Sequence, residues 1–163
     1  MTSDTLTTLA TLVGARLRAK GMMLATAESC TGGWVAQAIT AIGGSSEWFE
    51  RGFVTYSDAA KQEMLGVSAR TLAAYGAVSE KTAREMAAGA LTHSRAQVAL
   101  AITGIAGPTG GTSEKPLGMV CLAWAAKDGV PNAETRHFKG NRDSVRRQSV
   151  IAALQGVLEL LED

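Results

Sequence analysis

Five consecutive apolar residues, Val98-Ala99-Leu100-Ala101-Ile102, limit the possible folds of this chain more than any other pattern in it. An unbroken apolar run of this length is expected of a central strand that is covered on both faces. Segments with strand-like and helix-like patterns alternate along the rest of the chain. That alternation predicts an α/β fold, namely a three-layer α/β/α sandwich.

Apolar periodicity and capping residues divide the first half of the chain into elements. Leu6, Leu9 and Val13 recur at helical spacing, which predicts the first helix. Other boundaries follow from residues that cap helices or from glycines that end them. The expected elements are a helix from Ser3 or Asp4 to about Lys20, a strand at 22–27, a helix to about Ile42, a strand at 53–56, a helix at 59–65 capped by Asp58, and a short helix at 68–74.

The second half contains the apolar strand and the longest glycine-rich segment of the chain. The residues from Gly104 to Gly118 include five glycines and two prolines, which predicts a loop. Two strands near the end of the chain are expected to pair antiparallel, so the sheet should be mixed. The expected elements are a helix from Ser79 to about His93, strands at 98–102, 119–126 and 134–138, and a helix from Asn141 to about Leu161.

The composition is that of an ordinary single domain spanning 1–163. The 163 residues, 46% of them hydrophobic, can fill a core without disulfides or a metal. Lys and Arg number 16 and Asp and Glu 15, and the resulting net charge of +1 argues against a nucleic-acid partner bound mainly through its phosphates. No apolar run approaches the roughly 20 residues that span a bilayer, so no membrane partner is expected.

The cysteines and the N-terminus indicate a cytoplasmic location. Cys30 and Cys121 form no CxxC pair and no zinc-binding pattern, so no metal is expected. This usage suits a reducing compartment. The first residues contain no basic region followed by an apolar stretch, so no signal peptide is expected.

Ser29 is the first candidate for chemistry. It follows a predicted strand and precedes Gly32 and Gly33, at the sheet edge where α/β proteins bind ligands. The amides from Cys30 to Gly33 would lie at a helix N-terminus, where N–H groups can hold an oxyanion or a phosphate. The alternative is that Ser29 or Thr31 only caps the helix. The pattern is not GxSxG, so the α/β-hydrolase elbow is not matched.

A serine nucleophile needs a base, and the chain offers two histidines and Lys61. His93 ends a helix and His137 lies in a strand, so a structural role is open to each. Lys61 falls in the first turn of a helix, where the dipole should lower its pKa. An unshifted lysine would cost roughly 4–5 kcal/mol to deprotonate at pH 7. Tyr56 could hydrogen-bond this pair, although Lys61 could also be a surface residue and Tyr56 a strand aromatic.

Two further segments could bind a substrate. The glycine-rich loop is neither a Walker A motif nor GxGxxG, but its small residues would let main-chain groups contact a ring or a phosphate; the alternative is a surface loop. Arg142 and Arg146 share one face at the start of the last helix, where arginine and helix amides suit a phosphate. Asp143 could instead pair with Arg147.

Six segments, in order along nearly the whole chain, resemble the nicotinamide-nucleotide amidase family, which is the C-terminal domain of the competence/damage-inducible protein CinA. The first reads Thr26-Ala27-Glu28-Ser29-Cys30-Thr31-Gly32-Gly33. The resemblance is to the stand-alone form, since the chain has no room for the extra N-terminal domain of long CinA proteins. The other segments are residues 43–57, 76–79, 103–108, 115–118 and 142–147.

The resemblance implies an activity and a set of site residues. The activity is hydrolysis of nicotinamide mononucleotide to nicotinic acid mononucleotide and ammonia, in pyridine-nucleotide recycling and without a metal or an organic cofactor. Carried over by position, Ser29 is the nucleophile, Lys61 the base and Tyr56 their hydrogen-bonding partner. Three hypotheses concern substrate binding. Amides around Thr31, Gly32 and Gly33 would hold the oxyanion, and Arg142 or Arg146 would hold the 5′-phosphate. The pyridine or the ribose would lie against the loop residues Thr103, Gly104, Ile105 and Gly107.

Three alternatives stay open beside this hypothesis. Cys30 is a rival nucleophile because it adjoins Ser29. The chain could be a non-catalytic nucleotide-binding or regulatory domain, or a protein-interaction module tied to competence or DNA damage. A homodimer or another homo-oligomer is the expected assembly, with the nucleotide as the small-molecule partner.

Overall fold

A five-stranded mixed sheet with strand order β2-β1-β3-β4-β5 forms the middle layer of the protein. The structure is a computed structural model that describes residues 2–162, with side chains from residue 5 onward. Strands β1 and β2 run parallel, as do β1 and β3, whereas β4 is antiparallel to both β3 and β5. The expected mixed sheet is confirmed. The strands are β1 (Leu24–Glu28), β2 (Phe49–Val54), β3 (Val98–Gly104), β4 (Met119–Ala126) and β5 (Asn132–His137).

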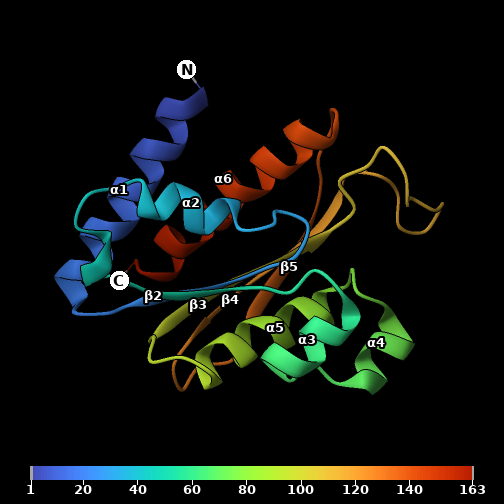
Figure 1. The fold of residues 1–163 in the computed structure, drawn as a ribbon, viewed down its shortest axis with the longest axis horizontal. Coiled ribbons are helices and arrows are strands. Elements are labelled where there is room, and N and C mark those ends of the chain that lie inside the picture. The colour runs from blue at the N-terminus through green and yellow to red at the C-terminus, as the bar shows by residue number, and fades with distance from the viewer. Residues whose placement is uncertain (1, 163) are drawn as a thin grey trace.

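Helices cover both faces of this sheet, which confirms the three-layer α/β/α architecture (Figure 1). One face carries α1 (Thr2–Lys20), α2 (Trp34–Thr40) and α6 (Arg142–Leu160). The opposite face carries α5 (Glu80–Thr92), with α3 (Asp58–Leu65) and α4 (Ala69–Tyr75) packed alongside it. A short 3-10 helix, η1 (Ser45–Glu47), precedes β2.

The two faces of the sheet differ in side-chain size. On the face toward α1 and α6, β3 presents Val98, Leu100 and Ile102, whereas toward α5 it presents Ala99 and Ala101. Strand β4 repeats the pattern, with large residues on the first face and small ones on the second. Small side chains let α5 lie close to the strands, since less volume separates the two layers.

Two strand boundaries differ from the predicted ones near the site. The strand predicted at 22–27 is β1, which extends to Glu28, and the one predicted at 53–56 is β2, which ends at Val54. Thr55 and Tyr56 leave the sheet because their carbonyl oxygens turn toward Lys61 and accept its hydrogen bonds.

Other corrections concern ends of elements. Ser57 rather than Asp58 caps α3, because the Ser57 hydroxyl accepts from the amide of Ala60. Gly104 belongs to β3, since it pairs with β4. The predicted capping role of Ser3 or Asp4 lies outside the described side chains. The caps predicted at Ser79 and Asn141 are confirmed.

Within the described chain, no helix is both long enough and apolar enough to cross a membrane. Among the same residues, no group of three or more His, Cys, Asp and Glu side chains could hold a metal ion.

Gly89 allows α5 to touch the end of α3. A Cβ atom at this position would stand 1.9 Å from the carbonyl oxygen of Leu65, far inside contact distance. Although alanine favours helices over glycine by about 1 kcal/mol, we expect Gly89→Ala to destabilise the fold by about 1–3 kcal/mol through overpacking. Thermal unfolding of this variant and of Gly43→Ala, whose added Cβ meets no atom within 4 Å, measures the effect. A Gly89→Ala protein as stable as wild type would contradict the packing.

Candidate active site

A cavity of about 330 Å³ opens where the carboxyl ends of β1 and β3 meet the glycine-rich loop. Its volume lies at the lower end of the roughly 300–1,000 Å³ of small-molecule sites. Ligands bind at this edge in open α/β sheets. The residues that line the cavity are Ser29, Cys30, Tyr56, Lys61, Ala77, Val78, Thr103, Gly104, Ile105, Ala106, Gly107, Thr109, Gly110 and Arg142.

Ser29 and Lys61 meet inside this cavity although 32 positions separate them in the chain. The Nζ atom of Lys61 lies 3.0 Å from the Oγ atom of Ser29. Ser29 is 7% exposed and Lys61 only 1%. The sequence predicted both residues for chemistry, and the surface role that stayed open for Lys61 is wrong.

Two carbonyl oxygens set the orientation of the Lys61 amine. They belong to Thr55, at 3.0 Å from Nζ, and Tyr56, at 3.3 Å. A neutral amine carries two N–H bonds and one lone pair. If the two N–H bonds are given to the two carbonyls, the lone pair is left for the hydroxyl of Ser29. The site is therefore built to present a proton acceptor to Ser29.

Burial is the main cause that lowers the pKa of Lys61 from its ordinary value. The ammonium form loses its water shell in this position, which favours the neutral amine. The Asp58 carboxylate and the Cys30 thiol act in the opposite direction. The lowered pKa agrees with the direction expected from the sequence, for which burial and the helix dipole were the two causes considered, and burial is the larger cause in the structure.

Glu28 organises the turn that carries Ser29, a role that the sequence did not reveal. Its carboxylate is 1% exposed and accepts four hydrogen bonds from residues just after Ser29. The signal available was an acidic residue at the end of a strand shortly before a helix, since a carboxylate is favoured at a helix N-terminus. The donors are the Thr31 hydroxyl at 2.6 Å and the amides of Gly33 at 3.2 Å, Val35 at 3.0 Å and Ala36 at 3.1 Å.

These bonds correct the expected oxyanion site. The amide of Gly33 is taken by Glu28, and that of Gly32 donates to the carbonyl of Ser29 at 3.0 Å. Within residues 2–162, the N–H groups of Cys30 and Thr31 donate no hydrogen bond to another residue. Cys30 lines the cavity whereas Thr31 is fully buried, so the amide of Cys30, not those of Thr31, Gly32 and Gly33, is the candidate oxyanion donor.

Cys30 is unsuited to act as the nucleophile. Burial raises the pKa of its thiol to about 11, with a partial opposing effect from the nearby Arg146 guanidinium. The thiolate is the reactive form of cysteine, and a thiol with so high a pKa is almost entirely protonated at neutral pH. Ser29, beside a basic group, is the better nucleophile.

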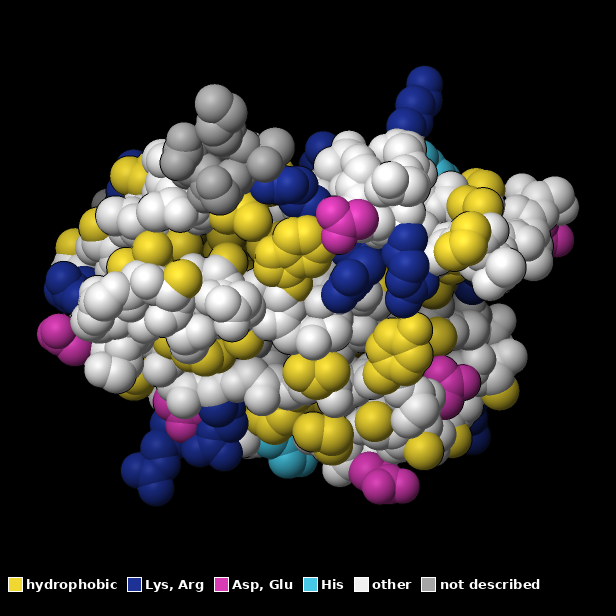
Figure 2. All heavy atoms as spheres, turned by 45° about the horizontal axis from the view of Figure 1, so that its top comes forward, with side chains coloured by type: hydrophobic (Ala, Val, Ile, Leu, Met, Phe, Trp, Pro, Cys, Tyr) yellow, Lys and Arg dark blue, Asp and Glu magenta, His cyan; other side chains and the backbone are white. Residues whose placement is uncertain are grey.

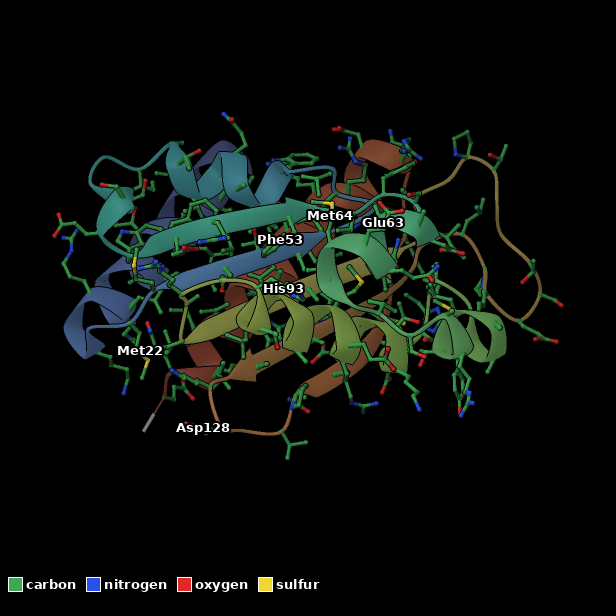
Figure 3. The ribbon with its side chains drawn as sticks, turned by 60° about the horizontal axis from the view of Figure 1, so that its bottom comes forward. Met22, Phe53, Glu63, Met64, His93 and Asp128 are labelled. Carbon is green, nitrogen blue, oxygen red and sulfur yellow. The ribbon has the colours of Figure 1, made fainter. Side chains whose placement is uncertain are left out.

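Neither histidine lies in the cavity. His93 is the C-terminal cap of α5, with its Nδ1 atom 2.8 Å from the carbonyl of Gly89. His137 ends β5 in register with Met119. Figure 3 labels His93, together with Glu63 and Met64 of α3, on the face of the sheet that α3 and α5 cover. The structural role that the sequence left open for both histidines agrees with these positions.

The glycine-rich loop forms one wall of the cavity. Thr103, Gly104, Ile105 and Gly107 all line it, as predicted for a binding segment. The Thr103 hydroxyl donates to the carbonyl of Ala77 at 2.7 Å. The amide of Ile105 donates to the carbonyl of Met119 in β4, and the carbonyl of Ile105 accepts from the amide of Gly118 at the end of the loop. Beyond this wall, Lys115 donates through its Nζ atom to the carbonyl of Tyr75.

The two predicted arginines occupy different places. Arg142 lines the cavity and donates from Nη1 to the carbonyl of Gly107 at 2.7 Å. Arg146 does not line it and instead contacts the carbonyls of Cys30 and Thr31. The structure thus separates a cavity arginine from one behind the Ser29 turn. It shows no ion pair between Asp143 and Arg147 within the described residues.

Tyr56 lines the cavity, but its contact with Lys61 runs through the backbone. Its carbonyl accepts from Nζ, whereas its side chain is 65% exposed. The predicted hydrogen-bonding partner is therefore a main-chain oxygen, not the phenol. Thr31, Gly32, Gly33 and Arg146 are the predicted site residues that do not line the cavity.

The fold and the site together define an α/β protein with a buried serine–lysine pair at the carboxyl edge of a mixed sheet. Residues 6–161 match the family model described as CinA C-terminal domain. The chain belongs to this family, and the resemblance read from the sequence is confirmed.

Named relatives match over nearly their full length. The chain is 55% identical to the nicotinamide-nucleotide amidohydrolase PncC of Escherichia coli (strain K12), covering 95% of this chain and 94% of that protein. It is 50% identical to the PncC of Pseudomonas putida, with coverage of 96% and 98%. The crystal structure of the competence/damage inducible protein CihA from Agrobacterium tumefaciens superposes with a TM-score of 0.94 at 46% identity, covering 97% of this chain and 96% of that one.

The raised pKa of Cys30 predicts slow alkylation. We expect iodoacetamide at neutral pH to leave Cys30 and Cys121 of the folded protein largely unmodified, because both thiols are buried and burial raises the pKa of each. Both should react fully in denaturant, which serves as the control. Mass spectrometry of peptides measures the modification. Rapid modification of Cys30 in the folded protein would contradict this description of the site.

Proposed function

We propose that this protein is an amidohydrolase that converts nicotinamide mononucleotide and water to nicotinic acid mononucleotide and ammonia. The observation that carries the proposal is the 3.0 Å contact between the Ser29 hydroxyl and the buried Lys61 amine. Relatives 55% and 50% identical over nearly the whole chain bear the name nicotinamide-nucleotide amidohydrolase, which supplies the substrate.

Acylation begins with proton transfer from Ser29. Neutral Lys61 accepts the hydroxyl proton while Oγ attacks the carboxamide carbon, and the resulting ammonium is held by the carbonyls of Thr55 and Tyr56. The carboxamide oxygen becomes an oxyanion, for which the amide of Cys30 is the candidate donor. The carbon–nitrogen bond then breaks, and Lys61 returns the proton to the leaving nitrogen, which departs as ammonia.

Deacylation repeats the same proton transfers with water. Neutral Lys61 takes a proton from a water molecule as its oxygen attacks the acyl carbon. Collapse of this second intermediate releases the pyridine carboxylic acid, and the proton returns to Ser29 Oγ. Each half-reaction uses Lys61 first as a base and then as an acid, so its pKa must lie close to the working pH.

The cavity wall supports binding of a nucleotide. Arg142 presents its guanidinium at the rim, where it would pair with the 5′-phosphate. Backbone groups from Gly104 to Gly107 would contact the pyridine or the ribose, because small residues permit a close approach. The alternative of a non-catalytic nucleotide-binding domain has no need of a buried Ser–Lys pair.

The proposal extends to the cellular setting. We place the activity in pyridine-nucleotide recycling in the cytoplasm, consistent with two reduced, buried cysteines. A homodimer is the proposed assembly, and light scattering of the purified protein would measure its mass.

Turnover tests the proposal directly. We expect the purified protein to release ammonia from nicotinamide mononucleotide, and Ser29→Ala and Lys61→Ala each to lose at least about 10³-fold in kcat, because they remove the nucleophile and its base. Matched controls are Ser46→Ala and Lys127→Ala, which alter exposed residues outside the cavity. Binding of the nucleotide without turnover by wild type would favour the non-catalytic alternative.

The lowered pKa of Lys61 predicts the shape of the pH profile. The amine is the active form, so kcat/KM should rise with pH as Lys61 loses its proton, and the rise should come below the ordinary lysine value of 10.5. Initial rates between about pH 6 and about pH 10 measure it. A rate that falls as pH rises through this range would contradict a lysine base.

A further inference from the structure

The glycine-rich loop between β3 and β4 projects from the body of the protein. We call residues 108–117 the outer loop. Figure 1 shows the loop in gold at the right, on the same side of the molecule as α4, and in Figure 2 the same region is a largely white projection, the colour of glycine, serine and threonine. Every residue of the outer loop is exposed except Lys115, which is half-buried. Lys115 is therefore the place at which the outer loop meets the rest of the chain.

A single hydrogen bond joins the outer loop to a distant element. The Nζ atom of Lys115 donates to the carbonyl of Tyr75, the last residue of α4. Among hydrogen bonds between described residues, no other one from the outer loop reaches beyond residues 104–119. The last carbonyls of a helix have no partner within the helix and attract a cation, so the ammonium of Lys115 satisfies one of them.

The residue that follows α4 leaves room for this ammonium. Gly76 has a φ of +80°, a conformation that residues with a Cβ atom rarely adopt. A Cβ atom at this position would stand 3.0 Å from the Nζ atom of Lys115, closer than ordinary contact distance. Glycine here lets the amine reach the carbonyl of Tyr75 without a clash.

The backbone of Lys115 connects this anchor to the cavity. Its carbonyl accepts from the amide of Thr112 at 2.8 Å, and its amide donates to the Thr112 hydroxyl at 3.0 Å. Gly111 packs closely on Leu117, since a Cβ atom at position 111 would stand 2.7 Å from the Leu117 amide nitrogen. Gly110 lines the cavity. The outer loop is thus a compact unit that Lys115 holds and that reaches the cavity at Gly110.

A second anchor joins the start of the loop to the segment after α4. The Thr103 hydroxyl donates to the carbonyl of Ala77 at 2.7 Å, and Ala77 itself lines the cavity. The bond from Lys115 to Tyr75 joins the loop to this segment again, from near the other end of the loop. The cavity-lining residues of the loop, from Ile105 to Gly110, lie between the two anchors in the sequence. Both anchors therefore fix the wall to which the nucleotide would bind.

We propose that Lys115 is a positioning residue that holds the glycine-rich loop in its substrate-binding conformation without touching the substrate. This inference rests on the proposed amidohydrolase function. Lys115 does not line the cavity, so its effect must pass through the loop. Without the anchor the loop would occupy other conformations, and affinity falls in proportion to the fraction of molecules in the competent one. Ser29 and Lys61 lie on other elements, so the chemical step should be preserved.

Steady-state kinetics on nicotinamide mononucleotide test this division. Lys115→Met keeps the apolar stem and removes the ammonium, and it should raise KM roughly 5- to 20-fold, since a competent fraction of about 0.1 weakens binding about 10-fold. Its kcat should fall less than about 2-fold. The matched control is Lys81→Met, which removes a cation from beside the same tyrosine: the Lys81 Nζ atom lies 5.5 Å from the centroid of the Tyr75 ring but belongs to α5.

A conservative variant and two contrary outcomes complete the kinetic test. Lys115→Arg should keep KM close to that of wild type, because a guanidinium can donate to the same carbonyl. A Lys115→Met protein with unchanged KM would overturn the inference. A Lys115→Met protein in which kcat falls and KM does not rise would overturn it as well.

Backbone relaxation NMR of the ligand-free protein separates anchoring from direct contact with the phosphate. Amide order parameters of residues 109–115 should fall below about 0.6 in Lys115→Met, whereas those of Lys81→Met should match wild type. Unchanged order parameters in Lys115→Met would overturn the proposal even if KM rises, because the lysine would then act on the substrate itself. A mobile loop in this variant beside a wild type that does not turn over the nucleotide would instead sink the proposed function and keep the anchor.

Discussion

Burial of β3 on both faces is the constraint on which the rest of the structure depends. A strand without a polar face must be covered twice, and the chain does this with α1, α2 and α6 on one side and α3, α4 and α5 on the other. Small side chains toward α5 and large ones toward α6 set different distances for the two layers. Because β1 and β3 run parallel, their carboxyl ends meet at one edge, and the cavity opens there.

Two buried charged groups, Glu28 and Lys61, and the half-buried Arg146 lie at this edge of the sheet. Glu28 is tied down by amides, Arg146 by carbonyls and the Trp34 ring, and Lys61 by two carbonyls and a hydroxyl. Buried polar groups are tolerated when all their hydrogen bonds are satisfied, and such networks hold their members in one geometry. Lys61 differs from the other two because it must also change its protonation state during the proposed reaction.

The desolvation of Lys61 links stability to the proposed chemistry. The same burial that lowers its pKa makes the charged form unfavourable in the folded protein. A functional site that buries an ionisable group lowers the stability of the folded protein, and the packing around the site keeps it in place. Here the surroundings are α3, fixed against α5 at Gly89, and the segment of Thr55 and Tyr56 that leaves β2.

Local sequence identified several members of the site. The strand, turn and glycines around Ser29 indicate an exposed side chain at a sheet edge, and Lys61 is marked by its place in the first turn of a helix. The order of elements was enough to predict a mixed sheet between two helical layers, and the match of 55% identity to a named relative agrees with the family read from the motifs.

The sequence by itself determined the fold class and the family, and the resemblance to that family selected the two residues of the proposed catalytic pair, because periodicity, caps and motifs are local properties. Only the tertiary structure decided which arginine faces the cavity, which amides Glu28 occupies and that the Tyr56 carbonyl, not its phenol, contacts Lys61. Those outcomes depend on distances between segments as far apart as Cys30 and Arg146. Packing of whole helices against the sheet sets such distances, and no local pattern encodes them.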